Sequence, residues 1–138
     1  MATIKSYTDL EQSRKLAEIL PLESADMYLW SSGKRYYIEA MDDGDFNEEE
    51  GHVRAWSLAV LLNLLPNEIS TGERYCDKYQ IDIRKYDGGD NTTLYQIAYG
   101  NNRGLSGSWH DMINTSEKES AIDACYEMII KLKELNLL

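Results

Sequence analysis

Three stretches of the chain repeat apolar residues at the spacing of an amphipathic helix. The first follows a capping-box pattern at Thr8–Glu11, in which a hydroxyl and a carboxylate bond the free amides of the first turn. Leu10, Leu16 and Leu20 then form a one-sided apolar stripe, and Pro21 stops it. The pattern predicts an amphipathic helix between these two signals.

The other two helical stretches are more apolar. Residues 53–65 read VRAWSLAVLLNLL before Pro66, and this nearly all-round apolar character predicts the most buried helix. The last stretch begins at a second capping box, Ser116–Glu119, and continues almost to the end of the sequence. Its apolar residues recur at alternating spacings of four and three: Ala121, Cys125, Met128, Leu132 and Leu135.

Between the helices, apolar and polar residues alternate, as they do in half-buried strands. Turn residues at Ser31–Arg35 and Asp87–Asn91 predict two hairpins. The strands are expected at residues 25–30, 36–41, 75–86 and 94–99, with a weaker one near Leu105–Trp109.

These elements predict an α+β fold in the order α-β-β-α-β-β-(β)-α. Consecutive hairpins favour one antiparallel sheet of four to five strands, with the three helices packed on one face. Residues 19–23 and 64–68 have similar sequences, and a two-fold α-β-β repeat is one interpretation of this similarity. The alternative is chance, because a proline after an apolar helix is an ordinary stop signal. With 138 residues, we expect residues 1–138 to form a single domain.

Charge and cysteine content narrow the function classes. The net charge of −10 and the lack of a basic stripe disfavour direct binding to nucleic acid or to an anionic membrane. No apolar run approaches the ~20 residues of a membrane span, and no secretory signal precedes the first helix. Two cysteines do not make a disulfide framework. We therefore expect a reduced, cytoplasmic protein.

Three segments, residues 6–28, 56–66 and 121–138, resemble a group of small uncharacterised proteins of gut anaerobes and their phages. The resemblance covers a little over a third of the chain and follows the helices and their stops. The group carries no assigned activity, cofactor or catalytic residue, so the resemblance implies no site. It favours a phage or mobile-element accessory role.

The most acidic segment is DDGDFNEEEG, residues 42–51. It carries six carboxylates: Asp42, Asp43, Asp45, Glu48, Glu49 and Glu50. We interpret it as a solvated loop whose last acids precede the second helix, where they interact favourably with its positive end by ~0.3–1 kcal/mol. The alternative is a contact region for a partner.

A metal site is not predicted. Read as an EF-hand from Asp43, the acidic segment has Glu48 where glycine belongs and Arg54 where the bidentate glutamate belongs. A weak, irregular cation site remains the alternative reading. His52 and His110 are the two histidines, and neither has a second ligand at a spacing typical of zinc sites.

Catalytic motifs are equally lacking. The sequence contains no nucleophile elbow, phosphate loop, dinucleotide fingerprint or HExxH pattern, and no cofactor is predicted. Cys125 lies on an apolar helix stripe, as a core residue does. Cys76 lies between Arg74 and Lys78, which could favour a thiolate, although a plain strand residue fits as well.

Aromatic residues on the first hairpin are the better functional signal. If Met27 and Leu29 face the helices, Tyr28, Trp30 and Tyr37 lie on the open face of the sheet as a contact surface, unless a loop covers them. We therefore expect a non-enzymatic protein-interaction domain, with inhibition of a nucleic-acid-binding protein as a specific form. The alternatives are an enzyme or ligand binder with a pocket between sheet and helices, and a homodimer through the sheet face.

Overall fold

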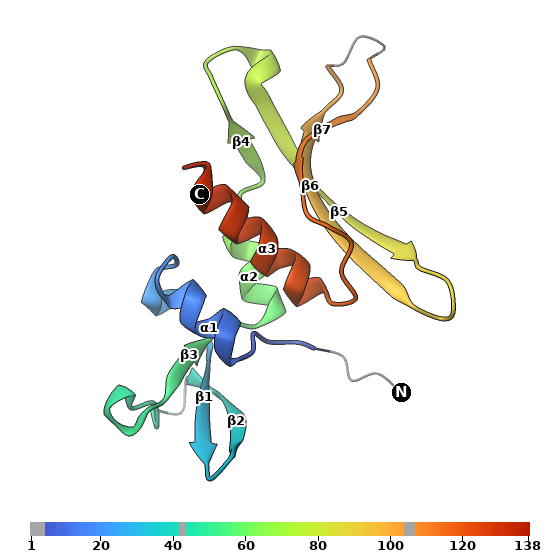
Figure 1. Cartoon of the computed structure of the whole chain (residues 1–138). Coiled ribbons are helices and arrows are strands. Elements are labelled where there is room, and N and C mark those ends of the chain that lie inside the picture. The colour runs from blue at the N-terminus through green and yellow to red at the C-terminus, as the bar shows by residue number, and fades with distance from the viewer. Residues whose placement is uncertain (1–4, 42–43, 104–106) are drawn as a thin grey trace. The chain divides into compact units, whose positions relative to one another are not determined.

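The computed structural model describes residues 5–41, 44–103 and 107–138 (Figure 1). The chain groups into two compact units, unit 1 from Met1 to Asn63 and unit 2 from Leu64 to Leu138. Each unit has its own antiparallel sheet.

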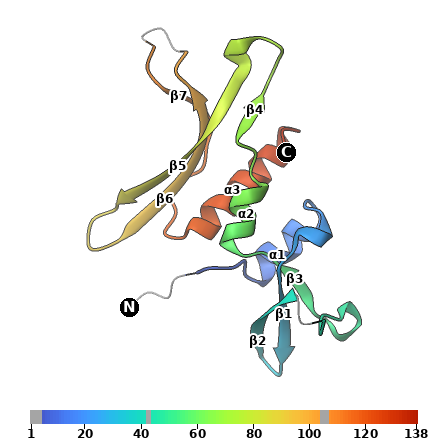
Figure 2. The ribbon, with the colours of Figure 1, turned by 180° about the vertical axis from the view of Figure 1, so that it is seen from behind.

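Unit 1 contains a three-stranded sheet in the order β2-β1-β3, in which β1 pairs with both neighbours (Figure 2). Its elements are α1 (Leu10–Ala17), the short 3₁₀ helix η1 (Leu22–Ser24), β1 (Met27–Ser32), β2 (Arg35–Ala40), the 3₁₀ helix η3 (Glu48–Glu50) and β3 (Val53–Ala55). Helix α2 (Leu58–Leu64) follows and carries the chain across the division between the units.

The core of unit 1 is built around Trp56, whose side chain is fully buried. Its backbone N–H donates to Thr8 Oγ1 at 3.1 Å, and the Thr8 N–H donates to the Trp56 carbonyl at 3.0 Å. The indole Nε1 donates to Ser24 Oγ at 2.9 Å. These bonds satisfy the polar groups of a buried aromatic residue and tie the segment before α1 to the end of β3.

Unit 2 contains a four-stranded sheet in the order β4-β5-β6-β7. Its elements are β4 (Glu68–Ser70), the 3₁₀ helix η4 (Tyr75–Asp77), β5 (Lys78–Asp87), β6 (Thr93–Asn101), β7 (His110–Asn114) and α3 (Ala121–Glu134). Helix α3 packs on β6. Both contribute buried side chains to the core, among them Ile97 and Tyr99 of β6 and Met128 and Leu132 of α3.

The α+β class, the antiparallel pairing and the order of helices and hairpins are confirmed. The difference is that the two hairpins belong to two separate sheets instead of one. Helix α1 packs against β3 of the first sheet and α3 against β6 of the second. A single sheet face covered by all three helices is therefore not what the chain forms. The single-domain expectation stays a prediction.

The second helix differs from its predicted form. Val53–Ala55 is strand β3, which pairs with β1, and the helix begins at Leu58. Leu61 is the one fully buried residue of α2, so the most buried helix is α3 instead. The apolar run 53–65 contains both elements, because a short apolar strand and a buried helix cannot be told apart by periodicity.

Both predicted capping boxes are displaced along the chain. The N-cap of α1 is Asp9, which accepts from Gln12 N at 2.8 Å, while Thr8 is buried against Ser13 and Trp56. The N-cap of α3 is Ser120, four residues after the predicted start.

The weaker last strand also lies further along the chain than predicted. Strand β7 occupies His110–Asn114 instead of Leu105–Trp109, and Leu105 lies outside the described residues. In the described parts of the chain, no helix has both the length and the apolar character needed to cross a membrane.

Candidate functional site

A hydrogen-bonded turn shapes the described part of the acidic segment. Asn47 Oδ1 accepts from the Glu49 N–H at 3.0 Å and caps the single turn η3. Gly51 ends the turn with a φ of 84°, a left-handed conformation that favours glycine. The Gly51 N–H closes the turn on the Glu48 carbonyl at 3.0 Å. The carboxylates of this turn are therefore presented by a folded segment.

His52 connects the two ends of this turn. Its Nδ1 accepts from the backbone N–H of Asn47 at 3.0 Å, and its Nε2 lies 3.7 Å from Glu50 Oε2. Since Nδ1 is an acceptor, the neutral ring carries its proton on Nε2, facing the Glu50 carboxylate. The imidazole is thereby fixed in one orientation.

Ring contacts dock the acidic segment on the sheet of unit 1. The His52 ring stacks on Tyr28 with centroids 5.1 Å apart, and Phe46 meets the same tyrosine edge-on at 5.6 Å. Arg54 lies over the Phe46 ring at 4.6 Å and forms an ion pair with Glu48. Aromatic pairs of this geometry stabilise by roughly 0.5–1.5 kcal/mol each beyond their buried area.

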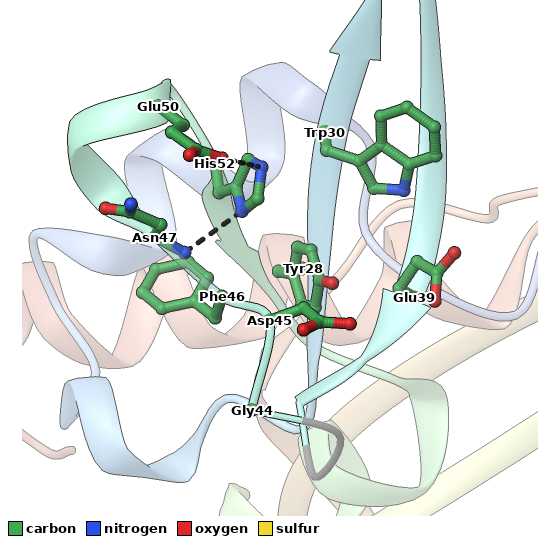
Figure 3. Close-up of a pocket in the computed structure, with 9 residues that line it drawn as sticks. All are labelled: Tyr28, Trp30, Glu39, Gly44, Asp45, Phe46, Asn47, Glu50 and His52. Atoms are coloured by element: carbon green, nitrogen blue, oxygen red, sulfur yellow. Dashed lines mark hydrogen bonds and ion pairs between the residues drawn. The ribbon is translucent and has the colours of Figure 1, made fainter.

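An open pocket with a volume of about 620 Å³ lies between the acidic segment and the sheet. We call it the acidic aromatic pocket; it is lined by Tyr28, Trp30, Glu39, Gly44, Asp45, Phe46, Asn47, Glu50 and His52. Figure 3 shows Trp30 and Glu39 on one side, Asn47, Glu50 and His52 on the other, and Tyr28 between them. All these residues belong to unit 1.

The chemistry of the pocket suits a cationic group. Three carboxylates, from Glu39, Asp45 and Glu50, line it, and no lysine or arginine is among its lining residues. Trp30 supplies an aromatic wall and is held by stacking on Tyr37, with centroids 4.7 Å apart. An ammonium or guanidinium group gains from both an aromatic face and carboxylate oxygens.

The predicted contact residues are partly brought together. Tyr28, Trp30, Asp45 and Glu50 line the acidic aromatic pocket, and Tyr37 adjoins it through its stack on Trp30. The register confirms that the three aromatic residues share one sheet face, with Trp30 opposite Tyr37.

Tyr28 is not open to solvent, so for this residue the alternative in which a loop covers the aromatic face is the correct one. It is 3% exposed, whereas Tyr37 is 42% exposed and Trp30 is half-buried. The reason is that Phe46 and His52 of the acidic segment cover the Tyr28 ring. The acidic segment and the aromatic face, predicted as two contact regions, form one surface.

The remaining acids of the segment take other places. Glu48 is paired with Arg54, and Glu49 is exposed outside the lining of the pocket. The segment leads into strand β3, so its last acids do not lie at the start of α2 as the sequence interpretation held.

Asp42 and Asp43 lie outside the described residues, so the weak cation site and their part in a contact surface stay predictions. Within the described chain, no three His, Cys, Asp or Glu side chains come together as a metal site would require.

Five lining residues were not among the predicted contact residues: Glu39, Gly44, Phe46, Asn47 and His52. Glu39 is directly opposite Tyr28 in the hairpin register, so a correct pairing of the strands identifies it. Phe46 is the one phenylalanine of the chain and lies within an acidic run, which is itself a signal of local burial. His52 carries no comparable signal, because its role depends on the turn that precedes it.

A second hollow, of about 260 Å³, has the exposed Cys76 among its lining residues. His110 and Asp111 also line it, but Asp111 is already engaged by Arg84 and by Trp109 Nε1 at 2.7 Å. The Arg74 charge that would favour a thiolate is paired with Asp77.

Cys125 is a core residue, as its place on the apolar stripe predicts. It is 1% exposed on α3, and burial raises the pKa of its thiol to about 12.

Comparison with known proteins gives no independent guide to this site. No protein-family model, no curated protein and no solved structure matches the chain. Its function is therefore argued from the pocket itself.

Proposed function

We propose that this protein is a non-enzymatic, cytoplasmic protein-interaction domain whose acidic aromatic pocket receives a lysine or arginine side chain of a basic protein partner. The observation that carries the proposal is the lining of the pocket, which combines three carboxylates with the aromatic wall of Trp30 and contains no lysine or arginine. The net charge of −10 adds long-range attraction toward a basic partner.

The partner class follows from this charge. A protein that binds nucleic acid presents a basic groove, and carboxylates on a folded segment can occupy that groove in place of phosphates. Inhibition of such a protein is the specific form of the proposal, and the resemblance to phage-related proteins supports an accessory role of this kind. Both cysteines are free, which supports a reduced compartment.

The test uses a short oligo-arginine peptide as the probe. We expect it to bind with an affinity that falls as salt rises, since exposed charge pairs are screened. Binding should shift the Trp30 indole resonance in the NMR spectrum of the labelled protein. The Trp56 indole, which is buried and bonded to Ser24, provides an internal reference.

A matched pair of triple variants separates the pocket from the net charge. Glu39→Gln, Asp45→Asn and Glu50→Gln together remove the three pocket carboxylates and should weaken binding about tenfold or more, as expected for charge-assisted contacts. The control neutralises three exposed acids elsewhere: Glu23→Gln, Glu73→Gln and Glu117→Gln. Equal weakening by both triple variants, or an affinity unchanged by salt, would contradict the proposal.

A further inference from the structure

Strand β2 is an edge of the unit 1 sheet, and its outer side is unpaired within the described chain. The strand runs for six residues, RYYIEA, without proline or an irregularity in its register with β1. Tyr36 and Tyr37 are 45% and 42% exposed. A regular, exposed edge of this length is a ready template for another strand.

The hydrogen-bond pattern shows which β2 residues face outward. Met41 N–H donates to the Asp26 carbonyl at 2.9 Å, so the residues that bond β1 are Met41 and every second residue before it. Arg35, Tyr37 and Glu39 therefore bond β1. Tyr36 and Ile38, between them, direct their backbone N–H and C=O groups away from the sheet.

We propose that β2 pairs antiparallel with β2 of a second copy of this chain, about a two-fold axis at Tyr37. A two-fold axis at Tyr36, Tyr37 or Ile38 lets the outward N–H and C=O groups of the two β2 strands bond each other. The register centred on Tyr37 places Arg35 of each copy opposite Glu39 of the other. It also places Tyr36 opposite Ile38, whose outward groups then bond each other.

Charge decides among these registers. Centring on Tyr36 leaves Arg35 opposite Tyr37, and centring on Ile38 leaves Glu39 opposite Tyr37. The Tyr37 register alone of the three forms two cross-strand ion pairs, each contributing roughly 0.2–1 kcal/mol. The backbone hydrogen bonds between the two β2 strands stabilise the dimer in any of the three registers, and the ion pairs favour the register centred on Tyr37.

The aromatic face becomes continuous across the axis. In this register Tyr37 is opposite its own copy in a pair without mutual backbone bonds, where opposite side chains are closest. The Trp30–Tyr37 stack of each copy therefore meets at the axis. The result is a six-stranded sheet in the order β3-β1-β2-β2-β1-β3 with both acidic aromatic pockets on one face. In the dimer the Glu39 carboxylate at the edge of each pocket is shared with Arg35 of the other copy, whereas Asp45 and Glu50 line the pocket as in the single chain.

Sedimentation velocity of the full chain over a concentration series tests the proposal. We expect a reversible dimer. Tyr36→Pro removes an outward N–H without touching a bond to β1, so it should shift the chain to a monomer. Tyr36→Ala keeps that N–H and should leave the dimer in place, which separates the backbone bond from the loss of the tyrosine ring.

Charge reversal tests the register without relying on proline. Arg35→Glu or Glu39→Arg alone places like charges opposite each other and should weaken the dimer. The double variant restores both opposite-charge pairs and should recover most of the dimer. A monomer at every concentration up to about 1 mM would overturn the proposal. A dimer that persists with Tyr36→Pro, or a double variant weaker than either single reversal, would also overturn it.

Discussion

Arg84 ties together three strands of the unit 2 sheet. From β5 it donates to Gln96 Oε1 on β6 at 3.2 Å and to both carboxylate oxygens of Asp111 on β7, at 2.9 and 2.6 Å. Asp82 on its own strand accepts a further bond at 2.7 Å. This bidentate pair raises the pKa of Arg84 and lowers that of Asp111 to about 2, because each holds the other in its charged form.

The depressed pKa of Asp111 predicts acid sensitivity. A carboxyl that is harder to protonate when folded stabilises the protein above its unfolded pKa, near the ordinary 3.8, and loses this as the pH falls toward 2. We expect Asp111→Asn to lower the free energy of unfolding by about 1 kcal/mol at neutral pH, less than the full pKa shift would give, because Asp111 is an exposed residue and solvent screens its pair with Arg84. The difference from the parent protein should shrink as the pH drops from 3.8 to about 2.

Urea denaturation at a series of pH values measures this difference. Glu117→Gln, which removes an exposed acid, is the matched control and should change the stability little at any pH. If the difference in free energy of unfolding between Asp111→Asn and the parent stayed constant across the acid range, the charge of Asp111 would not be what stabilises the protein.

Helix starts depend on contacts that lie before the helix. Ser116 fits a capping box, yet its N–H and hydroxyl bond the Glu127 carboxylate, at 3.0 and 3.2 Å. The neighbouring Lys118 instead pairs with Tyr95 of β6 through two backbone bonds. This bridge holds residues 116–119 out of the helix, and α3 begins after Ser120, whose Oγ accepts from Asp123 N at 3.4 Å.

Substitution of the two serines distinguishes the alternative helix starts. We expect Ser120→Ala to lower the free energy of unfolding by about 1 kcal/mol, as loss of an N-cap does. Ser116→Ala removes an exposed hydroxyl bond and should have a smaller effect. Urea denaturation of both variants gives the comparison. A larger loss for Ser116→Ala would favour the capping box at Ser116.

At the scale of the whole molecule, the chain has two compact units, each with its own sheet. Buried amides offer a matched probe in each. Trp56 N–H in unit 1 donates to Thr8 Oγ1, and Ile97 N–H in unit 2 donates to Thr115 Oγ1, both at 3.1 Å. Such amides exchange with solvent through large-scale opening of the structure that holds them.

A single cooperative domain predicts the same free energy of opening for the Trp56 and Ile97 amides. If residues 1–138 unfold as one cooperative domain, Trp56 and Ile97 should exchange with the same free energy of opening. Native-state hydrogen exchange in low urea, read by NMR, measures both in one sample. Two clearly different opening free energies would instead show that the units unfold separately.

The sequence by itself determined the features that depend on neighbouring residues. Apolar spacing identified α1 and α3, turn residues identified both hairpins, and alternation assigned Tyr28, Trp30 and Tyr37 to one face. These features can be predicted because period and turn chemistry act over a few residues. The α+β class follows from them.

Tertiary structure decided what depends on distant residues. Pairing of Val53–Ala55 with β1 turned the start of an apolar run into a strand, and the division of the strands gave two sheets instead of one. Packing of Phe46 and His52 on Tyr28 buried a residue that alternation had placed on an open face. The pocket exists because these contacts join positions well apart along the chain, and the local pattern carries no information about which distant segment will cover a given face.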